Sequence, residues 1–108
     1  MLEAKKIAAM AETRQAQIAP HLYCGPVVAA ANIQIACCSP NFLILESIGK
    51  FDGPFMKFLN TTIQWEDGYV IPPSTPGLGV EFNDQAISDN PYDEKELHLN
   101  LATDPVVQ

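Results

Sequence analysis

The chain has 108 residues, of which 47% are hydrophobic and 18% charged, a balance typical of a globular rather than a disordered protein. Its net charge of −7, with only 6 basic residues, argues against nucleic acid as a partner, because phosphate binding needs clustered Lys and Arg. No apolar run reaches the about 20 residues that a membrane span needs. The 3 cysteines include an adjacent pair, which does not predict a disulfide framework and favours a reducing cytoplasm.

Residues 2–13 predict a first helix. Leu2, Ile7, Met10 and several alanines give it an apolar face, while the basic pair Lys5-Lys6 is expected on a solvated face. No capping side chain precedes it, since Met1 begins the sequence.

Two strands and a second helix are expected next. Residues 17–20 predict a short strand, and residues 26–38 predict a helix that is apolar nearly all round and therefore largely buried. Pro26 suits the first position of that helix, and the adjacent Cys37 and Cys38 are expected to be core thiols. Residues 42–45 are continuously apolar, as in a parallel strand covered on both faces. This alternation of helices and strands predicts an α/β fold built from βα units.

The second half of the sequence is less regular. A helical turn is expected within residues 54–59, and residues 63–65 and 69–71 predict a hairpin with a Gly-containing turn. Asn83 or Asp84 is expected to cap a short helix that ends near Ser88. The alternating residues 97–101 predict another short strand.

His21 is the first candidate for chemistry. It follows a predicted strand, where side chains of a βα barrel form the active face, and it can act as a general acid or base. The helix start at Gly25 offers free backbone N–H groups to a substrate carboxylate, and Tyr23, between the two in sequence, is expected to line the same substrate site. The alternative is a histidine that only makes a hydrogen bond within a loop.

Glu46 directly follows the second predicted strand. If the two strands are parallel, its carboxylate points to the same face as His21, where it can hydrogen-bond to a developing enolate. The alternative is a partly exposed glutamate at a strand end. Together the two residues occupy equivalent places in successive βα units, which favours a shared site.

Other candidate sites are weaker. Glu66 and Asp67 could be a metal pair, but Asp-Gly favours a turn. Cys24 and the adjacent Cys37-Cys38 pair lack the spacing of a zinc site, and His98 is expected on the surface. We therefore predict no metal site in this chain.

Five short segments resemble, in order, the end of an enolase-superfamily chain of the mandelate racemase/muconate lactonizing enzyme family, with sugar-acid dehydratases the most similar. They are EAKKIA at 3–8, IAPH at 18–21, NFLILE at 41–46, DGY at 67–69 and PGLG at 76–79. The resemblance implies a capping domain and a (β/α)7β barrel that removes a proton next to a carboxylate with the help of Mg²⁺. It places His21 after the seventh strand as general base or acid, and Glu46 after the eighth as a ligand of the substrate carboxylate or the enolate.

The resemblance also implies what this chain lacks. The family's metal ligands come from the third to fifth strands, its Lys motif from the second, and the Asp partner of the histidine from the sixth. Residues 1–60 would be the end of the barrel and residues 61–108 a segment that packs on the capping domain. We expect a fragment that binds no Mg²⁺ and has no activity alone, and that self-associates or needs the missing N-terminal portion. The alternatives are a small non-enzymatic interaction module and, with less support, a thiol-dependent regulator.

Overall fold

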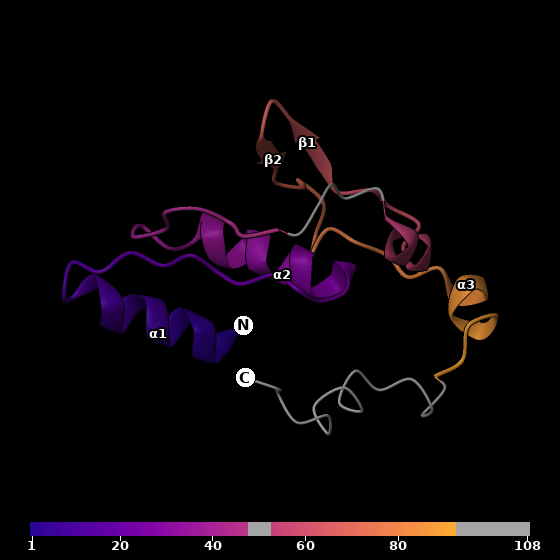
Figure 1. Ribbon diagram of the computed structural model, residues 1–108, viewed down its shortest axis with the longest axis horizontal. Coiled ribbons are helices and arrows are strands. Elements are labelled where there is room, and N and C mark those ends of the chain that lie inside the picture. Colours follow the sequence, from indigo (N-terminus) through magenta and orange to yellow (C-terminus); the bar gives the residue numbers. More distant parts are fainter. Residues whose placement is uncertain (48–52, 93–108) are drawn as a thin grey trace, which may run out of the picture.

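The computed structural model describes residues 1–47 and 53–92. Within these ranges the elements follow one another as α1 (Leu2–Glu12), α2 (Pro26–Cys37), the 3-10 helix η1 (Pro54–Phe58), β1 (Gln64–Glu66), β2 (Tyr69–Ile71) and α3 (Asp84–Ser88). In Figure 1, α2 lies at the centre, the β1–β2 hairpin projects from one side of it, and α3 lies at the end remote from α1. The mixture of helix and strand confirms the α/β class, while the strand predicted at residues 97–101 lies outside the described residues.

Helix α1 ends one residue before its predicted end, but it buries a different face. Its three large apolar side chains are exposed, with Leu2, Ile7 and Met10 at 69%, 62% and 71%. Ala8 is the residue of α1 that is buried. Lys5 is not simply solvated, because its ammonium donates to the Cys38 carbonyl, whereas Lys6 pairs with Glu3 at 2.8 Å. The predicted apolar face is therefore wrong for its three large side chains and confirmed for Ala8, while Lys5 contacts Cys38.

Helix α2 carries the core. Pro26 fills its first position, where the missing N–H is not needed. Four buried residues form a stripe at helical spacing, Pro26, Ala29, Ala30 and Ile33, and Ile35 is buried on the opposite side of the helix. Val28 (40%) and Cys37 are exposed, but the other residues of α2 are buried or half-buried, so the expectation of a largely buried helix is confirmed. Cys37 and Cys38 are exposed free thiols, so the expectation that they are core residues is wrong.

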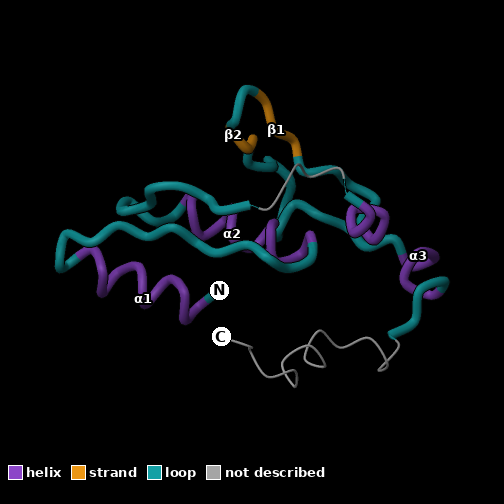
Figure 2. The backbone as a smooth tube through the Cα atoms, viewed as in Figure 1, coloured by secondary structure: helices purple, strands orange, loops and turns teal. Residues whose placement is uncertain are grey.

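The segments around Ile18 and Phe42 run side by side in parallel, as the tube of Figure 2 shows. Their pairing is one isolated bridge, Ile18 to Phe42, and not the two strands that the sequence predicted. Leu43 and Ile44 are 59% and 60% exposed, so this segment is not covered on both faces either. One physical reason for the short ladder is Pro20, which has no N–H to donate.

The second half is held by local turns and by one contact between distant segments. Asp67 (φ 50°) and Gly68 (φ 85°) form the two-residue turn of the hairpin, as Asp-Gly predicted. Segment η1 confirms the predicted helical turn, and it is joined to the stretch before α3 by the Leu59 to Phe82 antiparallel bridge. Asn83 is the cap of α3, its side chain accepting from the Ala86 N–H at 3.1 Å. Within residues 1–47 and 53–92 no helix has the length and apolarity to cross a membrane.

Candidate functional site

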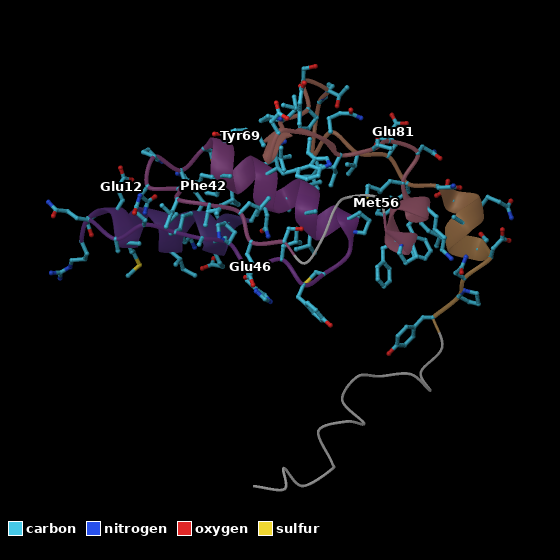
Figure 3. The ribbon with its side chains drawn as sticks, turned by 45° about the horizontal axis from the view of Figure 1, so that its top comes forward. Glu12, Phe42, Glu46, Met56, Tyr69 and Glu81 are labelled. Atoms are coloured by element: carbon cyan, nitrogen blue, oxygen red, sulfur yellow. The ribbon has the colours of Figure 1, made fainter. Side chains whose placement is uncertain are left out.

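The two predicted site residues meet. His21 Nδ1 contacts Glu46 Oε2 across the two parallel segments, in a hydrogen-bonded ion pair when the imidazole is protonated. The side chains are 67% and 53% exposed, so the pair lies at the surface of this chain. In the view of Figure 3, Glu46 lies below α2 and Tyr69 of the hairpin above it. Glu46 therefore lies on the other side of α2 from Tyr69 in that view.

Backbone and side-chain hydrogen bonds fix the segment that carries His21. Ile18 N donates to Asn41 O and Leu43 N donates to Ile18 O, both at 2.9 Å. From α2, Asn32 Nδ2 donates to the carbonyl of His21 at 3.1 Å. The main chain that carries the imidazole is thus hydrogen-bonded both to the neighbouring parallel segment and to α2.

The contact decides which nitrogen of His21 is available. A carboxylate only accepts hydrogen bonds, so Nδ1 must carry the proton in the contact with Glu46. In the neutral ring Nε2 then has its lone pair free, and in the cation Nε2–H is a donor. No hydrogen bond to Nε2 joins it to any other described residue. Nε2 is therefore the atom that can take or give a proton at a bound molecule.

Tyr23 and Gly25 lie on the same connection as His21 but are not joined to the pair. Tyr23 is 62% exposed, and among the described residues no hydrogen bond links it to His21 or Glu46. Gly25 is the N-cap of α2, and its carbonyl accepts from Val28 N at 3.1 Å. The structure thus brings together two of the four predicted site residues and leaves the other two nearby in sequence.

The residues present do not fit a magnesium ion. Mg²⁺ prefers about six oxygen ligands in octahedral geometry, and the pair offers one carboxylate and one imidazole. No group of three or more His, Cys, Asp or Glu side chains converges in residues 1–47 and 53–92. Asp67, the alternative metal residue of the sequence, is instead part of the hairpin turn. Any metal chemistry needs ligands from outside the described residues.

A second surface feature is an apolar groove of about 680 Å³ between α2, the second parallel segment and the hairpin. Its walls include Leu43, Ile44, Trp65 and Tyr69. Three of these side chains are at least half exposed, Tyr69 most of all at 75%. This groove is an uncovered apolar surface, the kind of surface that another segment or another chain covers at an interface.

Residues 1–86 match the family described as enolase C-terminal domain-like. The chain belongs to this family. Among curated relatives, a D-galactonate dehydratase family member of Streptomyces bingchenggensis is 32% identical over 97 residues, which cover 88% of this chain and 23% of that protein. A D-galactonate dehydratase of Xanthomonas campestris pv. campestris is 36% identical over 100 residues, covering 84% of this chain and 26% of that protein.

Solved structures agree with this assignment. A mandelate racemase/muconate lactonizing enzyme structure from Labrenzia alexandrii is 64% identical with a TM-score of 0.84, covering 91% of this chain and 25% of that one. One from Jannaschia sp. CCS1 is 39% identical with a TM-score of 0.79, with the same coverage of both chains, 91% and 25%. The enolase C-terminal domain-like chain therefore spans about a quarter of the length of the relatives it matches.

Two asparagines of this enolase-type chain were not singled out from the sequence. Asn32 holds the His21 carbonyl, and Asn41 Nδ2 donates to the carbonyls of Ala8 and Ala16 at 3.0 and 2.9 Å. The signal was present for Asn32, because a polar residue inside an apolar helix usually has a specific hydrogen-bond partner. Its partner cannot be named from the sequence, since the carbonyl lies 11 residues away along the chain.

Proposed function

We propose that this chain is the C-terminal part of the (β/α)7β barrel of a sugar-acid dehydratase, in which His21 transfers a proton at the substrate. Residues 1–60 would close the barrel and residues 61–108 would return to the capping domain. The contact between His21 Nδ1 and Glu46 carries the proposal, because it leaves Nε2 as the atom for proton transfer. Dehydration is favoured over racemization because curated relatives are named D-galactonate dehydratase.

Glu46 has two possible roles in this site. To donate a hydrogen bond to an enolate, its carboxyl group must be protonated. In the contact with His21, Oε2 of Glu46 accepts the hydrogen bond from Nδ1–H, so the carboxylate acts as acceptor to the ring. We therefore give Glu46 the role of holding the His21 ring, with its second oxygen open to a substrate hydroxyl.

The ligands for Mg²⁺ would have to come from other parts of the protein. In the family Mg²⁺ stabilises the enolate, and this chain offers too few oxygen ligands for it. We therefore propose that the 108-residue chain has no dehydratase activity by itself. The cytoplasmic location that the cysteines suggest stays a prediction.

A chimera tests the proposal. Residues 1–108 replace the C-terminal quarter of the Xanthomonas campestris relative, of which this chain matches 26%. We expect Mg²⁺-dependent dehydration of D-galactonate by the chimera and none by the chain alone. His21→Ala should lower kcat by about 10²- to 10⁴-fold, the usual contribution of a general acid or base. A folded, active chimera that is indifferent to His21→Ala would overturn the proposed role.

The matched pair Glu46→Gln and Glu46→Ala separates the two roles of Glu46. If Glu46 holds the ring, Glu46→Gln keeps an acceptor for Nδ1–H and retains more kcat than Glu46→Ala. If Glu46 instead binds the substrate directly, the two variants mainly raise KM.

A second candidate function is a small non-enzymatic module that self-associates. The apolar groove favours it, since Leu43 and Ile44 are 59% and 60% exposed beside Tyr69. The chimera separates the candidates, because an interaction module would not restore turnover to the relative.

A further inference from the structure

The main chain of His21 is fixed on both sides of its Cα atom by hydrogen bonds from two different segments. The peptide that precedes the Cα atom is held through its oxygen, because Glu46 N donates to the carbonyl of Pro20 at 3.3 Å. The peptide that follows is held by the side chain of Asn32, whose Nδ2 donates to the His21 carbonyl at 3.1 Å. Among the described residues, these are the hydrogen bonds that reach the two peptides flanking His21.

Two fixed peptides determine the direction in which a side chain leaves the main chain. The Cα–Cβ bond is set by the backbone N and C atoms around the same Cα atom, and each of these atoms belongs to one of the two planar flanking peptides. Only the side-chain torsions χ1 and χ2 of the imidazole are then left to vary. The contact of His21 Nδ1 with Glu46 Oε2 therefore requires that the Cα–Cβ bond of His21 already points toward Glu46.

Burial of the next residue does not replace the hydrogen bond from Asn32. Leu22 is only 4% exposed, so apolar packing keeps this part of the chain in place. Hydrophobic packing is non-directional, however, and does not specify how the peptide between His21 and Leu22 is rotated. A hydrogen bond does specify it, because the bond weakens steeply when donor and acceptor are misaligned. The rotation of this peptide therefore depends on the amide of Asn32.

Asn32 occupies a position in α2 where its amide brings no advantage to the helix itself. It lies between the buried residues Ala30 and Ile33, and Asn is a poorer helix former than Ala. Its side chain is half-buried, and a polar group removed from water needs a hydrogen-bond partner. Among the described residues that partner is the His21 carbonyl. A carbonyl oxygen only accepts, so the NH₂ end of the Asn32 amide must face it.

We propose that Asn32 is a positioning residue for the proton transfer at His21. Its amide fixes the peptide that follows His21 and so holds the imidazole where Nδ1 meets Glu46 and Nε2 stays free. The inference rests on the proposed roles of His21 and Glu46, but it concerns a residue outside the pair, in the second turn of α2. A merely structural Asn32 would stabilise the chain without affecting the ring, whereas a positioning Asn32 changes the state of the ring in the folded protein.

The experiment measures the tautomer of His21 in the folded 108-residue chain. Long-range ¹H–¹⁵N spectra of protein labelled on histidine nitrogens are recorded at a pH where the imidazole is neutral. The contact with Glu46 keeps the proton on Nδ1, and Glu46→Ala defines the ratio of the Nδ1–H form to the Nε2–H form without that contact. His98, the second of the 2 histidines, is the reference within each spectrum.

We expect Asn32→Ala to lower the ratio of Nδ1–H to Nε2–H by about 2- to 10-fold, the factor by which one ordinary hydrogen bond changes an equilibrium. Asn32→Leu fills similar space and suits a helix, yet it has no donor, so it should lower the ratio as much. Gln34→Ala, on the same helix and also half-buried in the native chain, should leave the ratio unchanged. If Asn32→Ala does not fold, Asn32→Leu decides.

An unchanged ratio in either Asn32 variant overturns the proposal, and so does an equal fall in Gln34→Ala. If Glu46→Ala keeps the wild-type ratio, the positioning role fails together with the ring-holding role of Glu46. The readout is independent of turnover. An inactive chimera combined with the expected tautomers refutes the proposed function alone, and an active chimera combined with tautomers that do not respond to Asn32 refutes the positioning role alone.

Discussion

Asn32 holds His21 from the adjacent helix, its Nδ2 donating to the His21 carbonyl at 3.1 Å. The bond links the second turn of α2 to the segment that carries the imidazole, so the helix and the site are not independent. The ring is oriented from one side by Glu46 and its main chain from the other by Asn32. Two residues distant in sequence from His21 thus determine where its free nitrogen points.

Removal of the Asn32 amide should cost measurable stability. Asn32→Ala leaves the His21 carbonyl without this donor, and we expect a loss of about 0.5–1.5 kcal/mol in the free energy of unfolding. Urea denaturation followed by circular dichroism measures it. Gln34→Ala is the matched control, because Gln34 lies on the same helix with similar intermediate exposure. Equal losses in the two variants would contradict a specific role for Asn32.

The glycines after the hairpin differ in what surrounds them. Gly77 and Gly79 both have positive φ, 72° and 74°, which costs a residue with a side chain about 1–2 kcal/mol. A Cβ at Gly77 meets open space, whereas one at Gly79 would overlap the ring carbons of Pro73. We expect Gly77→Ala to cost the backbone term alone and Gly79→Ala to cost about 1–3 kcal/mol more, through overpacking. Thermal unfolding of the two variants tests this, and similar losses would count against the close approach at Pro73.

The sequence predicted the structure correctly where residues adjacent along the chain determine the local conformation. Pro26 at the start of α2 and the Asp67-Gly68 turn both act through their own backbone angles. Burial was predicted less well, because it depends on surfaces contributed by other segments. Leu43, an apparent core residue, is 59% exposed, since no described segment covers it.

The candidate site was predictable as a pair of residue types but not as a geometry. His21 and Glu46 were both expected at segment ends, and they do meet. They meet in the register in which Glu46 N donates to the carbonyl of Pro20, and the apolar pattern of residues 42–45 does not reveal that register. Roles at a substrate stay predictions.

Asn83 has two separable contacts. Its Oδ1 accepts from Ala86 N at 3.1 Å as the cap of α3, and its Nδ2 donates to Lys57 O in η1 at 3.2 Å. Asn83→Ala removes both and should cost about 1–2 kcal/mol, whereas Asn83→Asp keeps the cap and loses only the donor. We expect the denaturation midpoint to be highest for the wild type, lower for Asn83→Asp and lowest for Asn83→Ala. Asp84 is the other residue that the sequence allowed as the cap, and Asp84→Ala should change the denaturation midpoint little. A larger loss of stability in Asp84→Ala than in Asn83→Ala would contradict Asn83 as the cap of α3.

The apolar groove predicts self-association of the isolated chain. Tyr69 is 75% exposed on its wall beside Leu43 and Ile44, and uncovered apolar surface of this kind is buried when copies associate. Light scattering should therefore give a mass that rises with concentration. Tyr69→Lys should shift the chain toward the monomer by adding a charge to the groove.

Tyr92→Lys is the control for the charge itself. Tyr92 is also 75% exposed, yet it does not line the groove, so both variants change the net charge of −7 equally. If both substitutions dissociate the chain alike, the cause is charge and not the groove. A wild-type chain that stays monomeric at every concentration removes the basis for self-association. In that case we propose that the groove packs against the rest of the proposed barrel, and the chimera should then be more stable than the chain alone.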